Sequence, residues 1–523
     1  MYSRSEASGS QMQSKREFMK CAVLLATAIV SVVGAAVELD FKEPEIIPIP
    51  EKLTYEPSVA VRIEAETAFS VACPDESAAP WVKGKVKSWF GVEPSSVEAV
   101  VSAGADGLGD EGYTLSAAPG RIAIAANSAV GVKYAMQSLR QVSERETGGT
   151  TLKGWWLPAL EIRDKPALKF RGVHFCWFPE CSAKLMERLV RVAASYKFNY
   201  VVLESWGVFK SKRYPFLSLP DAPLDAAEAK RLVSVAKDLG ITIIPQVNIY
   251  GHAAFSRMIV GKHVALDYGP EHLPLFESYN GWNWCLSNPA ARKVLKGFVE
   301  EVHEAFGNPP FFHIGCDEAD SPSCPVCRAA KPYSALVEAH IRDVANLLRR
   351  RGARAMMWHD MLIEKDKWGQ FYAHGSPDDA KMADTLPKDI VICDWYYGGI
   401  PEKKDGAGLY PTMDYFVSKG FSVVTSPWHN EKGIDAQAEY VRDKGYFGFL
   451  ETVWHHYRGH KFAIAMEQSA CAAWGKCRER PPRRQGGFAF STHWRECGWD
   501  MGIPSYSETG FWGSQVSPDS HDD

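Results

Sequence analysis

The chain has 523 residues, of which 46% are hydrophobic, and a formal net charge of −4 at pH 7. This length exceeds what a single core of ordinary size needs, so we expect more than one domain. A charge this close to neutral argues against nucleic acid as a partner, because phosphate binding requires a strongly basic surface. The 17 Trp, 20 Tyr and 25 Phe suit either a site that stacks flat faces on sugars or a large aromatic core.

The first 36 residues have the pattern of an export signal. Lys15, Arg16 and Lys20 precede the apolar run CAVLLATAIVSVVGAA, which ends in small residues. The run is shorter than the roughly 20 residues of a membrane-spanning helix. We therefore predict a cleaved signal peptide over residues 1–36 and a secreted or periplasmic protein. A retained membrane anchor is the alternative, and no other membrane contact is expected.

A small α+β domain is predicted over residues 59–150, after a proline-rich, extended lead-in over residues 37–58. The alternating stretches GYTLSAA and RIAIAAN predict strands, and AVGVKYAMQSLRQV predicts an amphipathic helix. Gly148, Gly149 and Gly154 then predict a linker to the next domain.

Eight apolar stretches alternate with amphipathic helices between residues 165 and 475. Near-continuous apolar strands are typical of a parallel sheet that is buried on both faces. The intervening helices carry start and stop signals: Asp225 and Glu228 open one of them, and Gly240 ends it. These units predict an α/β fold, a (β/α)8 TIM barrel, with a C-terminal tail of unknown role over residues 476–523. The predicted strands are 169–176, 199–204, 242–248, 311–317, 354–360, 389–396, 421–428 and 446–454.

Polar and aromatic side chains gather at the carboxyl ends of these strands, where the active sites of such barrels lie. The long loop over residues 249–287, after the third strand, should lie on the same face. The strand ends carry Glu204, Trp206, Gln246, Asn248, His252, Asp317, Glu318, Trp358, His359, Asp360, Asp394, Trp395, Tyr396, Trp428, His429, Asn430, Glu451 and Trp454.

The stretch FFHIGCDEAD, residues 311–320, places Asp317 and Glu318 side by side after a buried strand. Neighbours within a strand point to opposite faces, so both can face one pocket only where the strand stops. Two carboxylates held together titrate as a coupled pair, and one proton is retained to higher pH. This suits a general acid beside a charged helper. A helix cap followed by a solvated loop acid is the alternative.

The segment HIGCDE, residues 313–318, resembles the His-x-Gly-Gly-Asp-Glu signature of glycoside hydrolase family 20, the β-N-acetylhexosaminidases. Cys316 replaces the second Gly, as in a hexosaminidase D-like variant. IIPQVNIYGHAA is similar to the family's Pro-Glu-Ile-Asp-x-Pro-Gly-His segment and supplies His252. GYTLSAAPGRIAIAANSAVGVKYAMQSLRQV and IRDKPALKFRG resemble the end of the family's small domain and its first barrel strand.

This resemblance implies an exo-acting β-N-acetylhexosaminidase that acts on N-acetylhexosamine-containing glycans by substrate-assisted hydrolysis with retention. By the family pattern, Glu318 protonates the leaving oxygen and then activates water, and Asp317 stabilises the 2-acetamido group as it cyclises. No metal or organic cofactor is expected, because the substrate supplies the nucleophile. The oligomeric state is not indicated.

The resemblance also implies a substrate pocket. Its tryptophans would line the space around the acetamido group. His252 with Glu204 would form a hydrogen-bond relay beside Glu318. The family's Arg that holds the outer hydroxyls is replaced by Pro179, and Glu180 is a candidate substitute. Either Tyr396 or Tyr397 would bond the acetamido group. The predicted substrate-binding residues are Trp358, Trp395, Trp454, His252, Glu204, Tyr396 and Arg171.

Two other readings remain open. A conventional retaining glycosidase would use Glu451 or Asp360 as a covalent nucleophile, and a catalytically silent protein would only bind carbohydrate. Cys324 and Cys327 in CPVC could form a disulfide, half of a metal site or a plain turn. No second Cys pair or His pair lies near them in the sequence, so no structural zinc is predicted.

Overall fold

The computed structural model describes residues 41, 43–102, 106–148, 151–178, 181–219, 221–253, 270–277, 281–402, 408–454, 462 and 464–475. The predicted signal peptide, the candidate Glu180 and the tail over residues 476–523 lie outside this part of the chain. Within it, no helix is both long enough and apolar enough to cross a membrane.

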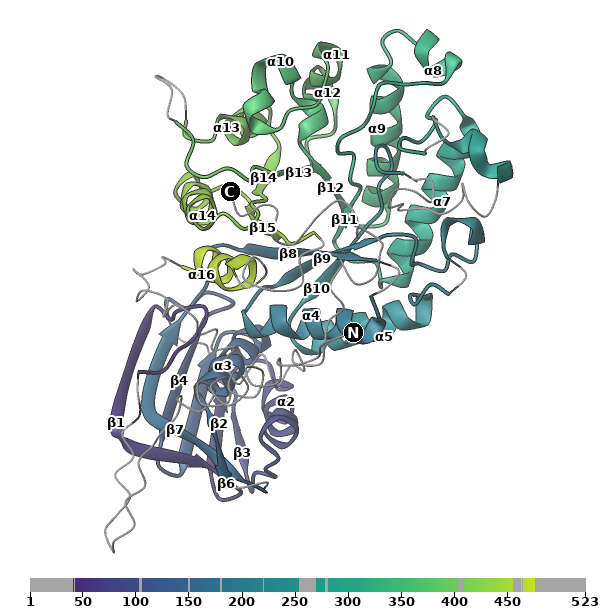
Figure 1. The fold of residues 1–523 in the computed structure, drawn as a ribbon. Coiled ribbons are helices and arrows are strands. Elements are labelled where there is room, and N and C mark those ends of the chain that lie inside the picture. Colours follow the sequence, from purple (N-terminus) through teal and green to yellow (C-terminus); the bar gives the residue numbers. More distant parts are fainter. Residues whose placement is uncertain are drawn as a thin grey trace, which may run out of the picture.

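The N-terminal domain is a mixed seven-stranded sheet with the strand order β1-β7-β4-β5-β2-β3 and with β6 paired to β7 (Figure 1). Strands β4 and β5 alternate buried and more exposed residues, because one sheet face packs against helices α2 and α3. Ser128 caps α3 by accepting a hydrogen bond from the Gly131 amide. The elements are β1 (Lys52–Ile63), β2 (Ala68–Ala72), α2 (Ala78–Lys85), β3 (Val97–Val100), β4 (Tyr113–Ala118), β5 (Arg121–Ala126), α3 (Ala129–Val142), β6 (Glu144–Gly148) and β7 (Thr151–Asp164).

The boundaries of this domain differ from the predicted ones. Strand β1 already begins at Lys52, and β7 continues to Asp164, so part of the predicted lead-in belongs to the sheet. The predicted linker is wrong as well, because Gly154 lies inside β7 and pairs with Glu146 of β6 next to a shift in register. A glycine in a strand interior often marks such a bulge and need not mark a loop.

The second domain is a closed barrel of eight parallel strands in the order β8 to β15, which confirms the predicted (β/α)8 architecture (Figure 1). Each strand lies where the sequence predicts one, but most are shorter, because the strand-end residues already turn into the loops. The strands are β8 (Phe170–Trp177), β9 (Tyr200–Ser205), β10 (Thr242–Gln246), β11 (Phe311–His313), β12 (Arg354–Trp358), β13 (Val391–Asp394), β14 (Ser422–Thr425) and β15 (Gly448–Thr452).

Helices surround the barrel, and the predicted cap at Asp225 is confirmed. Asp225 accepts a hydrogen bond from the Glu228 amide at the start of α5, and Asn288 caps α7 directly before Pro289. The helices are α4 (Ala183–Ser195), α5 (Ala226–Asp238), α7 (Pro289–Ala305), α8 (Pro325–Ala329), α9 (Ser334–Arg350), α10 (Lys365–Trp368), α11 (Pro377–Ala380), α12 (Met382–Thr385), α13 (Pro411–Ser418), α14 (Glu431–Lys444) and α16 (Ser469–Trp474).

Every barrel strand contributes at least one apolar side chain to a core inside the barrel. Because side chains alternate between the two faces of a strand, the residues two positions further along also point inward, while their neighbours point to the helices. The inner layer therefore determines which side chains can reach the mouth. It contains Phe170, Val202, Ile244, Phe311, Met356, Val391, Val424 and Leu450.

A buried ion pair joins the two domains. Lys197 Nζ lies 3.1 Å from Asp164 Oδ2, and both side chains are fully buried. Asp164 also accepts hydrogen bonds from the Tyr113 hydroxyl at 2.9 Å and from Trp474 Nε1 at 2.8 Å. The end of the N-terminal sheet is thereby fixed to the first turn of the barrel and to its last helix.

We expect Lys197→Met to lower the free energy of unfolding by about 3 kcal/mol, because it leaves the buried Asp164 carboxylate without its cation. Urea unfolding at constant protein concentration measures the change. Lys296→Met removes an exposed ion pair with Asp343 and serves as the control, with an expected loss below about 1 kcal/mol. Equal midpoints for the two variants would contradict the role given to the buried pair.

Candidate active site

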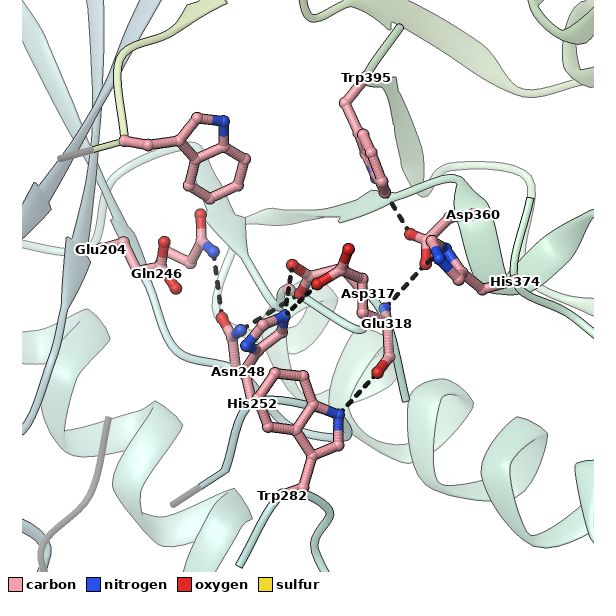
Figure 2. A network of polar contacts seen from close by, with 12 residues as sticks. Glu204, Gln246, Asn248, His252, Trp282, Asp317, Glu318, Asp360, His374 and Trp395 are labelled. Atoms are coloured by element: carbon pink, nitrogen blue, oxygen red, sulfur yellow. Dashed lines mark hydrogen bonds and ion pairs between the residues drawn. The ribbon is translucent and has the colours of Figure 1, made fainter. Parts of the chain in front are cut away.

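A left-handed turn directly after β11 brings Asp317 and Glu318 to the mouth of the barrel. The strand ends at His313, and Gly315, Cys316 and Glu318 then have φ values of 66°, 77° and 47°. These values interrupt the alternation that would send two neighbouring side chains to opposite faces. Both carboxylates consequently approach one imidazole: His252 Nε2 lies 3.1 Å from Glu318 Oε2 and 3.3 Å from Asp317 Oδ2 (Figure 2).

The two carboxylates differ in their exposure to solvent. The Asp317 side chain is 6% exposed, whereas that of Glu318 is 43% exposed. Asn248 Nδ2 donates to Asp317 Oδ1 at 3.3 Å, and Gln246 Nε2 donates to Asn248 Oδ1 at 3.0 Å. Asp317 is therefore held from inside the barrel, while Glu318 faces the side from which a ligand enters.

His252 and Trp282 support Glu318 from the loop after β10. The His252 ring packs against the Trp282 ring with a centroid distance of 4.2 Å. Trp282 Nε1 donates to the backbone oxygen of Glu318 at 2.7 Å (Figure 2). The other nitrogen of His252, Nδ1, is buried and has no hydrogen-bond partner among the described residues.

The predicted relay from His252 to Glu204 is therefore wrong. Glu204 lies in β9 and is buried, and its carboxylate is 3.1 Å from His174 Nε2. The thiol of Cys176 donates to the same carboxylate at 3.5 Å. Both partners come from β8, the neighbouring strand, in which Cys176 pairs directly with Glu204 and His174 lies two residues earlier. Glu204 thus belongs to a buried cluster deeper in the barrel.

Asp360, directly after β12, holds Glu318 from the other side. Its fully buried carboxylate accepts hydrogen bonds from the Glu318 amide at 2.8 Å and from Trp395 Nε1 at 3.1 Å (Figure 2). His374 Nδ1 lies 3.2 Å from the same carboxylate, and this hydrogen bond raises the pKa of His374 although burial opposes it. Asp360 therefore couples the position of the acid to that of an aromatic wall.

Aromatic rings line the space beside the acids. Trp454 Nε1 donates to the Tyr397 hydroxyl at 2.9 Å, and the Tyr397 ring lies 5.2 Å from Trp395 and 5.3 Å from Trp428. Burial, and secondarily the carboxylates of the acid pair, raise the pKa of Tyr397. Trp358 is fully buried and lies 5.6 Å from Trp454, so it supports that ring and does not reach the surface.

Tyr396, the predicted acetamido partner, points elsewhere. Its hydroxyl lies against Gly398, and its ring packs on Phe371 with a centroid distance of 5.3 Å. The backbone oxygen of Tyr396 accepts a hydrogen bond from Gln437. Tyr397, the other residue considered, is the one that approaches the carboxylates.

The structure also contradicts the substrate contact predicted for Arg171. Its buried guanidinium donates to both carboxylate oxygens of Glu111 at 3.0 Å and to the Leu168 backbone oxygen at 2.6 Å. Arg171 is the second residue of β8, so it lies at the end of the strand opposite the active-site mouth. It also follows the inward-facing Phe170 and therefore points outward. Its role is to join the two domains.

Several residues of the site were not predicted as site residues. Asn248 and Asp360 lie just after strands, and the sequence pattern had placed both among the polar residues at the strand ends. Trp282 and His374 lie in loops without periodicity, and only the aromatic repeat in NGWNW marks the first of them. Their positions follow from loop conformation, for which the sequence contains no comparable signal.

A closed (β/α)8 barrel whose mouth holds a shielded carboxylate, an exposed carboxylate and a wall of aromatic rings is the architecture of a carbohydrate-cleaving hydrolase. The chain belongs to glycoside hydrolase family 20. Residues 43–165 match the family profile "Glycosyl hydrolase family 20, domain 2", and residues 221–428 match "Glycosyl hydrolase family 20, catalytic domain".

The chain spans about a third to a half of the length of two curated relatives that it matches. A beta-hexosaminidase of Porphyromonas gingivalis is 24% identical over 294 residues, which are 49% of this chain and 36% of the relative. A beta-hexosaminidase of Vibrio furnissii is 24% identical over 61% of this chain and 54% of the relative. The structure of an exo beta-N-acetylglucosaminidase from Vibrio harveyi has a TM-score of 0.61 at 18% identity, and the match covers 87% of this chain and 78% of that one. This likeness shows the fold.

We expect Gly251→Ala to reduce kcat/KM for a nitrophenyl β-N-acetylglucosaminide by roughly 100-fold, because small displacements of reacting groups have effects of that size. A Cβ at Gly251 would lie 2.2 Å from the backbone oxygen of Asp317, so the acid-bearing turn must move. Gly84→Ala, where a Cβ meets nothing within 4 Å, is the control and should retain full activity. A Gly251→Ala enzyme with unchanged kcat/KM would show that the turn tolerates displacement.

Proposed function

We propose that the chain is an exo-acting β-N-acetylhexosaminidase that removes terminal N-acetylhexosamine from glycans by substrate-assisted retention. The observation that carries the proposal is the unequal burial of two adjacent carboxylates that both contact His252. Family membership supports the same reading. A deep acid and an outer acid on one turn can serve the two sides of a single sugar ring.

In the first step, the oxygen of the substrate's 2-acetamido group attacks the anomeric carbon while the bond to the leaving oxygen breaks. Glu318 gives its proton to that oxygen, and its exposed position suits contact with the outgoing sugar. The positive charge that develops on the cyclised acetamido group lies beside Asp317. The Asn248 hydrogen bond keeps that carboxylate in place, so it need not reorganise during the reaction.

In the second step, water attacks the anomeric carbon from the side that the leaving group vacated. Glu318, now a carboxylate, accepts the proton of this water, and the acetamido group reopens with overall retention. His252 lies within hydrogen-bond reach of both carboxylates and steadies the pair as the proton leaves and returns.

The aromatic wall suits the cyclised intermediate. Trp395 and Trp454 exclude water from an intermediate that water would otherwise open early. The Tyr397 oxygen accepts a hydrogen bond from Trp454 and lies within hydrogen-bond reach of Thr452, so its own hydrogen would turn from Thr452 to the acetamido oxygen when substrate binds. Orientation of the acetamido nucleophile would thus come from residues that follow β13 and β15.

The conventional two-carboxylate reading fits the geometry poorly. Glu451 follows the inward-facing Leu450, so it points out of the barrel, where Ser469 of α16 donates to an oxygen of its buried carboxyl group. The Asp360 carboxylate is directed at the Glu318 amide. Neither faces the space beside Asp317, so substrate assistance is the better account.

The expectation of export remains part of this proposal. The basic residues and the apolar run before residue 37 support it, and glycans outside the cell would be the substrates. Selection between gluco and galacto epimers must come from groups other than Arg171, because that side chain is occupied by Glu111.

We expect Glu318→Gln to lower kcat for nitrophenyl β-N-acetylglucosaminide by roughly 100- to 10,000-fold, the range for loss of a general acid. Asp317→Asn should lower it by roughly 100-fold or more, because the intermediate loses its counter-charge. Glu304→Gln, an exposed residue on α7, is the control and should behave as wild type.

Turnover and inhibition measurements distinguish the substrate-assisted enzyme from a conventional glycosidase and from a silent binding protein. A thiazoline that mimics the cyclised intermediate should inhibit the wild type strongly, whereas a conventional glycosidase would be nearly insensitive. A folded wild type without turnover on either the gluco or the galacto substrate would favour the silent binding protein. Full activity in Glu318→Gln would show that the acid is wrongly assigned.

We expect Glu451→Gln to retain full turnover and to raise the free energy of unfolding at pH 7. Burial raises the pKa of the Glu451 carboxyl well above its ordinary value. The stability of the folded wild type therefore falls as the pH rises above the unfolded-state pKa of about 4.3, and Gln escapes this loss. Urea unfolding at pH 4 and pH 7 should show a gain only at the higher pH. A loss of turnover would instead support Glu451 as a nucleophile.

A further inference from the structure

Four potential metal ligands from two loops converge beside the active site, outside the catalytic groups. They are the carboxylate of Glu277 and the thiols of Cys285, Cys324 and Cys327. Three of these side chains are buried, and Cys324 is partly exposed. We propose that they bind a structural Zn²⁺ ion that joins the loop after β10 to the loop after β11. The proposal does not depend on the hydrolase activity.

The spacing of the ligand atoms suits tetrahedral zinc. The four atoms all lie within 4.8 Å of one another, and the sulfurs of Cys285 and Cys327 are 3.8 Å apart. A tetrahedron with Zn–S bonds of about 2.3 Å has sulfur–sulfur edges of about 3.8 Å. A disulfide would need about 2.05 Å. Three thiolates are also soft ligands, which favour zinc over magnesium or calcium.

Glu277 provides an independent indication of a bound cation. It is 7% exposed, and its Oε2 accepts hydrogen bonds from the amides of Ser323 at 3.0 Å and Cys324 at 2.8 Å. Its Oε1 is buried and accepts no hydrogen bond from an amide or hydroxyl among the described residues, whereas the Cys327 thiol, a weak donor, lies within hydrogen-bond reach of the carboxylate. A buried carboxylate with so weak a partner is costly, and a metal ion among the neighbouring sulfurs would compensate its charge.

Polar groups around the sulfurs have positions that suit a bound metal. The amides of Val326 and Cys327 donate to the Cys324 sulfur, as expected for a Cys-x-x-Cys turn around a metal. Ser287 Oγ lies 3.0 Å from the Cys327 sulfur, 3.4 Å from that of Cys285 and 3.8 Å from that of Cys324. Its hydroxyl can therefore donate to a thiolate from a position outside the ligand set.

The expected consequence is a fixed active-site loop. Between the two ligands of the first loop lie Trp282, which donates to the Glu318 backbone, and Asn283. The Asn283 side chain donates to the Asp320 backbone oxygen at 2.7 Å and accepts from the Asp320 amide at 3.1 Å. A zinc ion bound by both loops would keep these hydrogen bonds in place. It would thereby position the backbone of Glu318.

Zinc analysis of the purified full chain by mass spectrometry tests the proposal directly. We expect about one zinc per chain after removal of loosely bound metal, and almost none in Cys324→Ser/Cys327→Ser. Cys73→Ser, a buried cysteine of the N-terminal domain, is the matched control and should keep its zinc. Cobalt exchanged into the wild type should show thiolate charge-transfer and tetrahedral absorption bands, and both should be absent from the double variant.

Glu277→Gln provides a second test if the double cysteine variant does not fold. It keeps an oxygen acceptor for the two amides but lacks the charge, so chelator competition should show at least about tenfold weaker zinc binding. The proposal is overturned by a folded wild type without zinc, by a disulfide between any two of the three cysteines, or by unchanged zinc affinity in Glu277→Gln. None of these readouts uses glycoside turnover, so failure of the zinc proposal is distinguishable from failure of the proposed enzyme activity.

Discussion

The active site depends on a single backbone turn at the end of β11. Because neighbours on a strand face opposite ways, two adjacent acids can share a pocket only where the chain leaves the extended conformation. The left-handed values at Gly315, Cys316 and Glu318 accomplish this. For Cys316 and Glu318, which carry side chains, such a conformation costs about 1 kcal/mol or more each, so the surroundings must enforce it.

The neighbouring strands supply that enforcement. Asn248, just after β10, bonds the Asp317 carboxylate, and Asp360, just after β12, bonds the Glu318 amide. β10 and β12 flank β11 in the barrel, so the turn is held from both sides. Gly315 belongs to the same arrangement, because a Cβ there would lie 2.3 Å from the Asn248 side chain. The reactive pair is therefore the product of three successive strand ends, which is why a parallel barrel suits it.

The strands and the acid pair could be predicted because their signals are local. An apolar stretch indicates a buried strand, and HIGCDE is one continuous segment. The partners of side chains were predicted less well. Strand alternation alone would have placed Arg171 and Glu451 outside the barrel, since Phe170 and Leu450 face inward. The predicted relay of Glu204 and the predicted acetamido contact of Tyr396 were wrong for another reason. The position of a residue at a strand end gives its level in the barrel, but the direction of its side chain depends on its neighbours.

The loop after β10 contains residues whose partners could not be predicted, because those partners lie far away in the sequence. For Cys324 and Cys327 the sequence allowed a disulfide, half of a metal site or a turn, and it gave no link to Glu277 and Cys285, which precede α7 in the chain and share no motif with them. The direct pairing of β10 with β11 brings the two loops together. The same loop carries Trp282 to the Glu318 backbone, so its order affects the acid directly. Asp317 is shielded and is held by Asn248 at the end of β10, whereas the exposed Glu318 is held through its amide by Asp360 and through its backbone oxygen by Trp282. One of the two contacts that fix the backbone of the exposed acid therefore comes from a long loop, the part of such folds in which sequence varies most.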